Sequence, residues 1–149
     1  EIIEKLQALE KFMMWYWVSR QNELALIDNY FYTHEVAKDV DELDKVYLRE
    51  VNKFSSFERG DDYKMYCAFL HIFWGGYEAK YYSYMWAEAY EADVFSKIKE
   101  NWIFNPEIWY RYRDLILAQW ARKPAKELFF DFMGREMSSE ALMKRYWLE

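Results

Sequence analysis

Residues 1–32, EIIEKLQALEKFMMWYWVSRQNELALIDNYFY, carry large apolar side chains at intervals of three and four residues. An α-helix places residues with this spacing on one face. The sequence therefore predicts one amphipathic helix over residues 1–32, with Arg20 interrupting its apolar face. The apolar series is Ile2, Leu6, Leu9, Met13, Tyr16, Leu24, Ile27 and Phe31.

The rest of the chain continues the helical pattern, and no stretch alternates strictly enough to predict a strand. Asn105-Pro106-Glu107 is a typical helix start, because asparagine caps the end, proline suits the first turn and the acid meets the helix dipole. The prediction is an all-α chain of six to seven helices. Beyond the first, these helices are expected over residues 40–51, 63–73, 77–100, 105–118, 124–134 and 139–144, with a loop at 55–62.

Composition narrows the classes of protein to which the chain can belong. Its 149 residues suit one domain, and 53% hydrophobic residues suffice for a core. A net charge of −6 argues against partners that are nucleic acids or anionic membranes. Cys67 is the only cysteine, which fits a reducing compartment. No apolar run approaches the roughly 18 residues of a membrane span, and no basic-then-apolar leader opens the chain. We therefore expect a soluble, cytoplasmic protein.

Two possible reactive sites are set aside. His34-Glu35 begins like the zinc-binding motif HExxH, but the fifth position is Lys38, so the second histidine ligand is missing. We expect His34 to be an exposed histidine and no metal site to form there. Cys67 is expected to be buried in an apolar helix. Further along, the carboxylates from Glu88 to Asp93 suggest a solvated helix edge.

His71 is a stronger candidate, because it precedes Trp74-Gly75-Gly76-Tyr77. Adjacent glycines let a loop adopt positive φ and approach a ligand closely. From its position alone, His71 is either a core histidine satisfied by a backbone carbonyl or part of a site.

Tyr77, Tyr81 and Tyr84 follow at i, i+4 and i+7, so a helix would project three phenols in one row. One interpretation is an aromatic core stripe. The other is a polar wall, since leucine or phenylalanine would fill a core without needing partners for three hydroxyls. Such a wall could donate hydrogen bonds to a peptide carbonyl or a developing oxyanion. Tyr82 and Trp86, on a neighbouring face, are then the expected packing residues.

Residues 69–88, FLHIFWGGYEAKYYSYMWAE, resemble the C-terminal catalytic segment of the thimet-oligopeptidase-like zinc metallopeptidases. That family includes oligopeptidase A, oligoendopeptidase F and bacterial peptidyl-dipeptidase. The spacing from histidine to the first tyrosine and the Tyr-Tyr-x-Tyr run carry the resemblance. It continues through residues 93–95, 112–117 and 134–136, so that it covers most of the chain.

The resemblance implies a two-lobed helical body around a channel that admits short peptides. A zinc held by HExxH and a downstream glutamate would activate water for peptide hydrolysis. His71, Tyr77 and Tyr84 would be the catalytic groups that stabilise the transition state. The substrate-binding residues would be Gly75, Gly76 and Tyr81.

In that family the zinc ligands lie upstream of the matching segment, and this chain contains no HExxH. Residues 1–149 are therefore expected to be one helical segment of a catalytic domain, inactive alone, with zinc bound by ligands outside this chain. The expected partners are short peptides and the upstream HExxH-containing part. The alternative is a non-catalytic helical scaffold, engineered or a degenerate paralogue, in which the aromatic stripe is core.

Several tryptophans stand where members of that family commonly carry glycine. If the backbone has positive φ at such a position, a side chain there costs about 1–2 kcal/mol. The positions are Trp102, Trp109, Trp120 and Trp147, with Trp15 as a further candidate, and Trp74 replaces a residue that is usually small.

Overall fold

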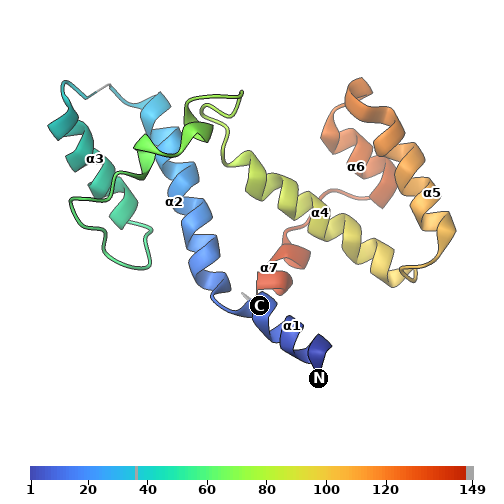
Figure 1. The fold of residues 1–149 in the computed structure, drawn as a ribbon. Coiled ribbons are helices and arrows are strands. Elements are labelled where there is room, and N and C mark those ends of the chain that lie inside the picture. Colours follow the sequence, from blue (N-terminus) through green and yellow to red (C-terminus); the bar gives the residue numbers. More distant parts are fainter. Residues whose placement is uncertain (36, 147–149) are drawn as a thin grey trace. The chain divides into compact units, whose positions relative to one another are not determined.

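The computed structural model describes residues 1–35 and 37–146, in two compact units with their boundary between Met85 and Trp86. Across these residues the structure contains seven α-helices, three short 3-10 helices and no strand (Figure 1). The predicted all-α class with six to seven helices is confirmed. None of the helices in the described ranges is long and apolar enough to cross a membrane.

The first unit holds α1 (Ile2–Lys11), α2 (Met14–Thr33), α3 (Val40–Asn52), η1 (Met65–Cys67) and η2 (Leu70–Ile72). Helix α4 (Ser83–Glu100) begins at the end of the first unit and continues into the second. The second unit also holds α5 (Pro106–Leu115), η3 (Leu117–Arg122), α6 (Ala125–Met133) and α7 (Glu140–Tyr146). The helices predicted from residues 40, 105, 124 and 139 are found, with ends shifted by no more than one turn.

The single helix predicted over residues 1–32 is wrong, because the chain breaks between α1 and α2. Met13 has a left-handed backbone with φ 59°. The Phe12 N–H bonds to the Leu9 carbonyl at 3.1 Å and closes the end of α1. No glycine or proline marks this break, and the apolar spacing runs straight across it. Periodicity alone therefore cannot reveal it.

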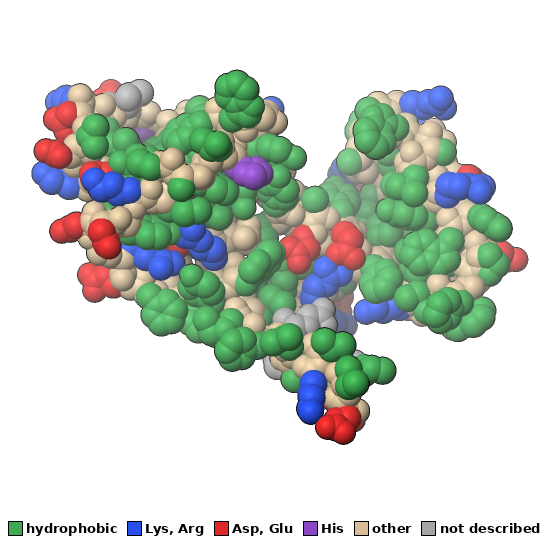
Figure 2. Space-filling view, in the orientation of Figure 1, with side chains coloured by type: hydrophobic (Ala, Val, Ile, Leu, Met, Phe, Trp, Pro, Cys, Tyr) green, Lys and Arg blue, Asp and Glu red, His purple; other side chains and the backbone are tan. Residues whose placement is uncertain are grey.

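Helix α1 presents an apolar face that nothing in the first unit covers. Figure 2 shows hydrophobic side chains at the surface of this helix, next to charged ones. The exposed fractions are 76% for Ile2, 59% for Leu6, 65% for Leu9 and 73% for Phe12. A contiguous exposed apolar face of this kind is typical of an interaction surface.

The helix predicted over residues 63–73 is also wrong, since this segment forms only two single turns, η1 and η2. The segment packs instead into the core between α2 and α3. That core is built on Ile27, Tyr47, Val51 and Ile72, all at most 2% exposed. Tertiary packing overrides helix propensity here. Flanking side chains from the segment are Tyr63, Met65, Tyr66 and Phe69.

Arg20 interrupts the apolar face of α2 because it pairs with a buried acid. Its guanidinium bonds to the Glu23 carboxylate, whose side chain is 1% exposed. The Tyr63 hydroxyl donates to the same carboxylate at 2.7 Å. A buried charge needs such partners to offset its desolvation. The polar break in the stripe is thus a second tie between α2 and the segment after residue 62.

The core of the second unit joins α4, α5 and α6 through Val94, Ile98, Ile108, Phe129, Phe132 and Met133. The predicted start of α5 is confirmed, because the Asn105 side chain accepts the Glu107 N–H at 3.0 Å. Gly134 ends α6 with a left-handed backbone, φ 77°.

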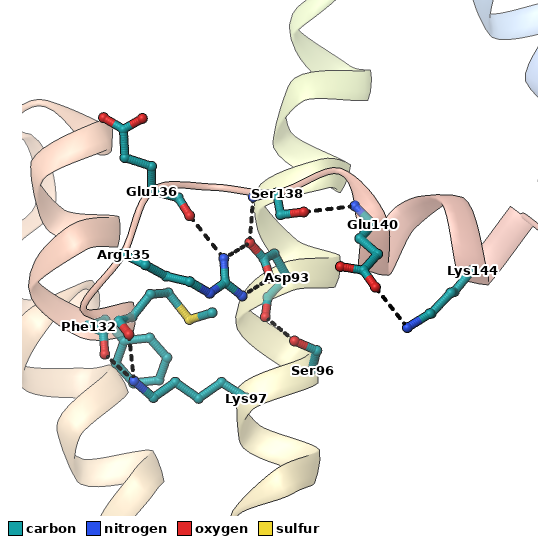
Figure 3. Close-up of polar contacts among 10 residues, drawn as sticks. Asp93, Ser96, Lys97, Phe132, Arg135, Glu136, Ser138, Glu140 and Lys144 are labelled. Carbon is teal, nitrogen blue, oxygen red and sulfur yellow. Dashed lines mark hydrogen bonds and ion pairs between the residues drawn. The ribbon is translucent and has the colours of Figure 1, made fainter. Parts of the chain in front are cut away.

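Asp93 corrects the expectation of a solvated acidic edge on α4. It is 2% exposed, and its two carboxylate oxygens accept from both Nη atoms of Arg135 at 2.8 and 2.6 Å (Figure 3). The Ser138 N–H adds a bond of 2.8 Å. Burial raises the pKa of Asp93, but the bonds from Arg135 and Ser138 outweigh it and leave that pKa below the usual value. Asp93 therefore ties α4 to the chain that follows α6.

Two of the unusual tryptophans occupy backbone conformations that favour glycine. Trp102 has φ 64°, and Trp120 has φ 41° and ψ −132°. Their side chains are 65% and 82% exposed, so packing does not offset the strain. Trp15 and Trp109 lie in helices with ordinary φ, and Trp147 lies outside the described residues.

Trp102→Gly and Trp120→Gly should each stabilise the protein by about 1 kcal/mol, because glycine adopts these conformations without steric cost. Urea unfolding measures the change. Trp109→Gly is the matched control: it puts glycine inside α5 and removes the indole N–H bond to the Ile103 carbonyl. It should destabilise by about 1 kcal/mol or more. Loss of stability in all three variants would contradict the explanation.

Candidate substrate-binding site

The candidate site extends from His71 in η2 to Tyr84 in the first turn of α4, and it is not the single helix face that the spacing predicts. Helix α4 begins only at Ser83, so that Tyr77 and Tyr81 lie in turns before it. The Lys80 N–H bonds to the Tyr77 carbonyl at 2.8 Å, and Ala79 has φ 59°. The helix predicted from residue 77 is therefore wrong over its first six residues.

The turns nevertheless bring His71, Tyr77, Tyr81 and Tyr84 together, and we call these four residues the tyrosine cluster. The rings of Tyr77 and Tyr84 stack with centroids 5.1 Å apart. Tyr81 lies 5.0 Å from Tyr84, and His71 lies 5.8 Å from Tyr77. The four predicted side chains thus form one contiguous group by a different local structure from the one expected.

Exposure separates the members of the tyrosine cluster. His71 is exposed, so its interpretation as a core histidine is wrong. Tyr77 and Tyr84 are 36% and 39% exposed, whereas Tyr81 is only 9% exposed. Tyr81 is therefore the buried member, against which His71 and Tyr84 pack, while the other three side chains are accessible to solvent.

The packing role expected for Tyr82 and Trp86 is also wrong, because these side chains are 48% and 54% exposed. The late start of α4 changes the direction of the Tyr82 side chain, which precedes Ser83, whereas Trp86 lies within α4 on an exposed part of its surface.

Gly75 and Gly76 both have left-handed backbones, with φ 90° and 84°. A Cβ atom on Gly75 would lie 4.0 Å from the Tyr77 ring, and one on Gly76 would meet nothing within 4 Å. The need for glycine here is therefore conformational rather than spatial.

The pKa values of two phenols of the cluster, Tyr81 and Tyr84, are raised above the ordinary value of 10.0. Hydrogen bonding to Tyr77, followed by burial, raises the pKa of Tyr84 to about 12. Burial likewise raises the pKa of Tyr81, against a smaller lowering by Arg20. Protonated phenols can donate to a carbonyl oxygen or an oxyanion.

Helix α2 contributes three supporting residues that sequence reasoning missed. The Tyr32 hydroxyl donates to the Ile72 carbonyl at 2.7 Å, and the Tyr81 hydroxyl donates to the Gln21 side chain at 2.9 Å. Asp28 accepts two backbone N–H groups, from Ala79 and Tyr81, each at 2.9 Å. The signal in the sequence is Asp28, an acid among the apolar residues of α2. The sequence does not reveal which groups bind to its carboxylate.

A zinc site does not form from the described residues. Within residues 1–35 and 37–146 no group of three or more His, Cys, Asp or Glu side chains could hold a metal. His34 is exposed and stacks on Tyr30 at 4.0 Å, as expected for a surface histidine. Cys67 is exposed, so its predicted burial is wrong; the reason is that residues 63–73 do not form the expected helix.

Comparison with known proteins connects these features to one family. The model of peptidase family M3 matches residues 1–148. Oligopeptidase A of Escherichia coli (strain K12) is 33% identical over 151 residues, covering 100% of this chain and 22% of that relative. Organellar oligopeptidase A of Arabidopsis thaliana is 33% identical over 148 residues, covering 97% of this chain and 19% of the relative.

A thimet-like oligopeptidase of Dictyostelium discoideum is 27% identical over 144 residues, covering 97% of this chain. The chain spans about a fifth of the length of these relatives. The resemblance found in residues 69–88 is confirmed: the chain belongs to peptidase family M3.

Proposed function

We propose that this chain is the substrate-binding and transition-state-stabilising portion of a zinc-dependent oligopeptidase that hydrolyses short peptides. The observation that carries the proposal is the tyrosine cluster in a chain of peptidase family M3. His71, Tyr77 and Tyr84 present exposed polar groups side by side, and the loop that connects η2 to α4 contains two glycines with left-handed backbones.

In this proposal the phenols act as hydrogen-bond donors. Attack of water on a peptide carbonyl moves negative charge onto the carbonyl oxygen. Donors already in place for that charge lower the barrier, because they need no rearrangement as it develops. Tyr77 and Tyr84 would supply O–H groups and His71 an N–H group. Buried Tyr81 would support their rings, with Gly75 and Gly76 allowing close approach of the peptide backbone.

The members of peptidase family M3 are zinc metallopeptidases. The zinc would polarise the carbonyl and lower the pKa of a bound water. The described residues provide no ligand set, so the proposal assigns the zinc ligands to an upstream HExxH-containing part. Two observations support such a partner: the exposed apolar face of α1, and the match to about a fifth of each relative.

A cytoplasmic location is part of the same proposal. One similar protein of Arabidopsis thaliana, 32% identical over 147 residues, is named a probable cytosolic oligopeptidase A. The single cysteine and the acidic net charge are compatible with that compartment.

The test uses the full-length protein that carries this chain. Native mass spectrometry should find one zinc per chain, and short fluorogenic peptides should be hydrolysed while casein is not. Removal of zinc with a chelator should abolish hydrolysis, and added zinc should restore it. A metal-free protein without peptidase activity would overturn the proposal and favour the non-catalytic scaffold.

A further inference from the structure

We propose that Asp28 is a positioning residue that holds the tyrosine cluster in its working geometry from helix α2. This inference rests on the proposed peptidase function. Asp28 acts on the backbone of the segment that carries the cluster. Its two oxygens accept the N–H groups of Ala79 and Tyr81 at 2.9 Å each.

The two bonds from Asp28 hold the C-terminal end of the loop between Ile72 and Tyr81. Another residue of α2 holds the start of the same loop. Tyr32 donates to the carbonyl of Ile72, the residue after His71, at 2.7 Å. Residues 28 and 32 are one helical turn apart, so they lie on the same face of α2. The Gly75-Gly76 turn therefore lies between two fixed points, Ile72 and Ala79.

The two hydrogen bonds to Asp28 are strong because their acceptor is a buried carboxylate. The residue is 0% exposed, and within residues 1–35 and 37–146 no ion pair to it is found. A buried carboxylate is costly unless hydrogen bonds satisfy it, and bonds from N–H groups to a carboxylate are stronger than neutral ones. If the loop moved away, it would leave this charge without those bonds. The loop conformation and the buried carboxylate thus depend on each other.

Ala79, which donates its N–H to Asp28, has an unusual backbone conformation. Its φ of 59° is unfavourable for a residue with a Cβ. That conformation lets the N–H groups of residues 79 and 81 reach the same carboxylate. Tyr77 stands two residues before this point and Tyr84 three residues after Tyr81, and their rings stack. A shift of residues 79–81 would therefore separate the donors that the proposed mechanism uses.

Asp28→Asn in the full-length protein tests the inference. Asparagine keeps one acceptor oxygen but turns an NH₂ group toward the second N–H, so one bond is lost. Hydrogen–deuterium exchange should become faster in residues 73–82 and stay unchanged in α3. For a short fluorogenic peptide, kcat should fall by about 10- to 100-fold, since small misplacements of catalytic groups have effects of that order. KM and zinc content should change little.

Asp93→Asn is the matched control, because Asp93 is an equally buried carboxylate that accepts a backbone N–H in the second unit. It should lower the unfolding midpoint without changing kcat below that midpoint. If Asp28→Asn does the same and leaves exchange in residues 73–82 unchanged, Asp28 is merely structural and the inference is overturned.

Tyr32→Phe is a milder second variant that decides the matter if Asp28→Asn does not fold. It removes the bond to the Ile72 carbonyl, and kcat should fall a few-fold with faster exchange in residues 70–78. Unchanged kcat and exchange would overturn the inference. A protein without peptidase activity would overturn the proposed function instead, and exchange alone would then decide whether Asp28 holds the loop.

Discussion

Tyr84→Phe should lower kcat/KM for a short peptide by about 100-fold, because loss of one preorganised donor to a developing oxyanion typically costs 10²–10³ in rate. The ring stack with Tyr77 survives this change, since only the hydroxyl is removed. His71→Ala should produce a decrease of similar order. Zinc content of the full-length protein should stay at the wild-type value in both variants, because neither residue is proposed as a metal ligand.

Tyr82→Phe is the control for this prediction. Tyr82 is 48% exposed and Tyr84 is 39% exposed, but Tyr82 is not a member of the tyrosine cluster. Its hydroxyl should be dispensable, and kcat/KM should stay within about 2-fold of wild type, as is usual for surface changes. Steady-state kinetics with zinc analysis on the same samples provides the comparison. Wild-type turnover in both Tyr84→Phe and His71→Ala would contradict the assigned roles.

Arg135→Ala should lower the free energy of unfolding by about 2–3 kcal/mol. Loss of one partner of a buried ion pair leaves the other charge uncompensated, which costs about 3–5 kcal/mol when both are buried. Asp93 is buried, whereas the Arg135 side chain is 48% exposed, so the expected cost lies at or below the lower end of that range. Urea titration at pH 7 measures the difference. Lys126→Ala, which breaks a pair whose side chains are both 71% exposed, should cost less than about 1 kcal/mol.

The effect of Arg135→Ala should depend on pH in one direction. The pKa of Asp93 in the folded protein lies below the ordinary value of 3.8. Its stabilising contribution is therefore complete above pH 4 and is lost as the pH falls through the folded-state pKa. The stability difference between wild type and Arg135→Ala should be constant from pH 5 to 7 and shrink below pH 4. A difference that persists unchanged at pH 2 would show that the ion pair is not its cause.

The sequence was sufficient where local chemistry decides the structure. Asn105 capped its helix and Gly134 ended another, as predicted, because both act through bonds and angles within a few residues. Apolar spacing correctly indicated an all-α chain. The four members of the tyrosine cluster lie together, although not along the single helix face that their spacing predicts.

The sequence failed where contacts distant in the chain override local preference. The helix break at Met13 contains no glycine or proline that would predict it. The residue spacing over 77–82 predicts a helix, but the structure has turns there. Asp93 looked like one of several exposed acids on α4, yet Arg135, 42 residues later, buries and pairs it.

The residues of this chain by themselves determined its helical class, its caps and the set of side chains that make the tyrosine cluster. Spacing and composition carry those properties, since each depends on near neighbours. The tertiary structure alone decided that Tyr77, Tyr81 and Tyr84 meet through turns rather than along a helix. The physical reason is a buried carboxylate: Asp28 takes the N–H groups of residues 79 and 81 from across 51 and 53 positions of sequence, and a helix would have used those groups within itself.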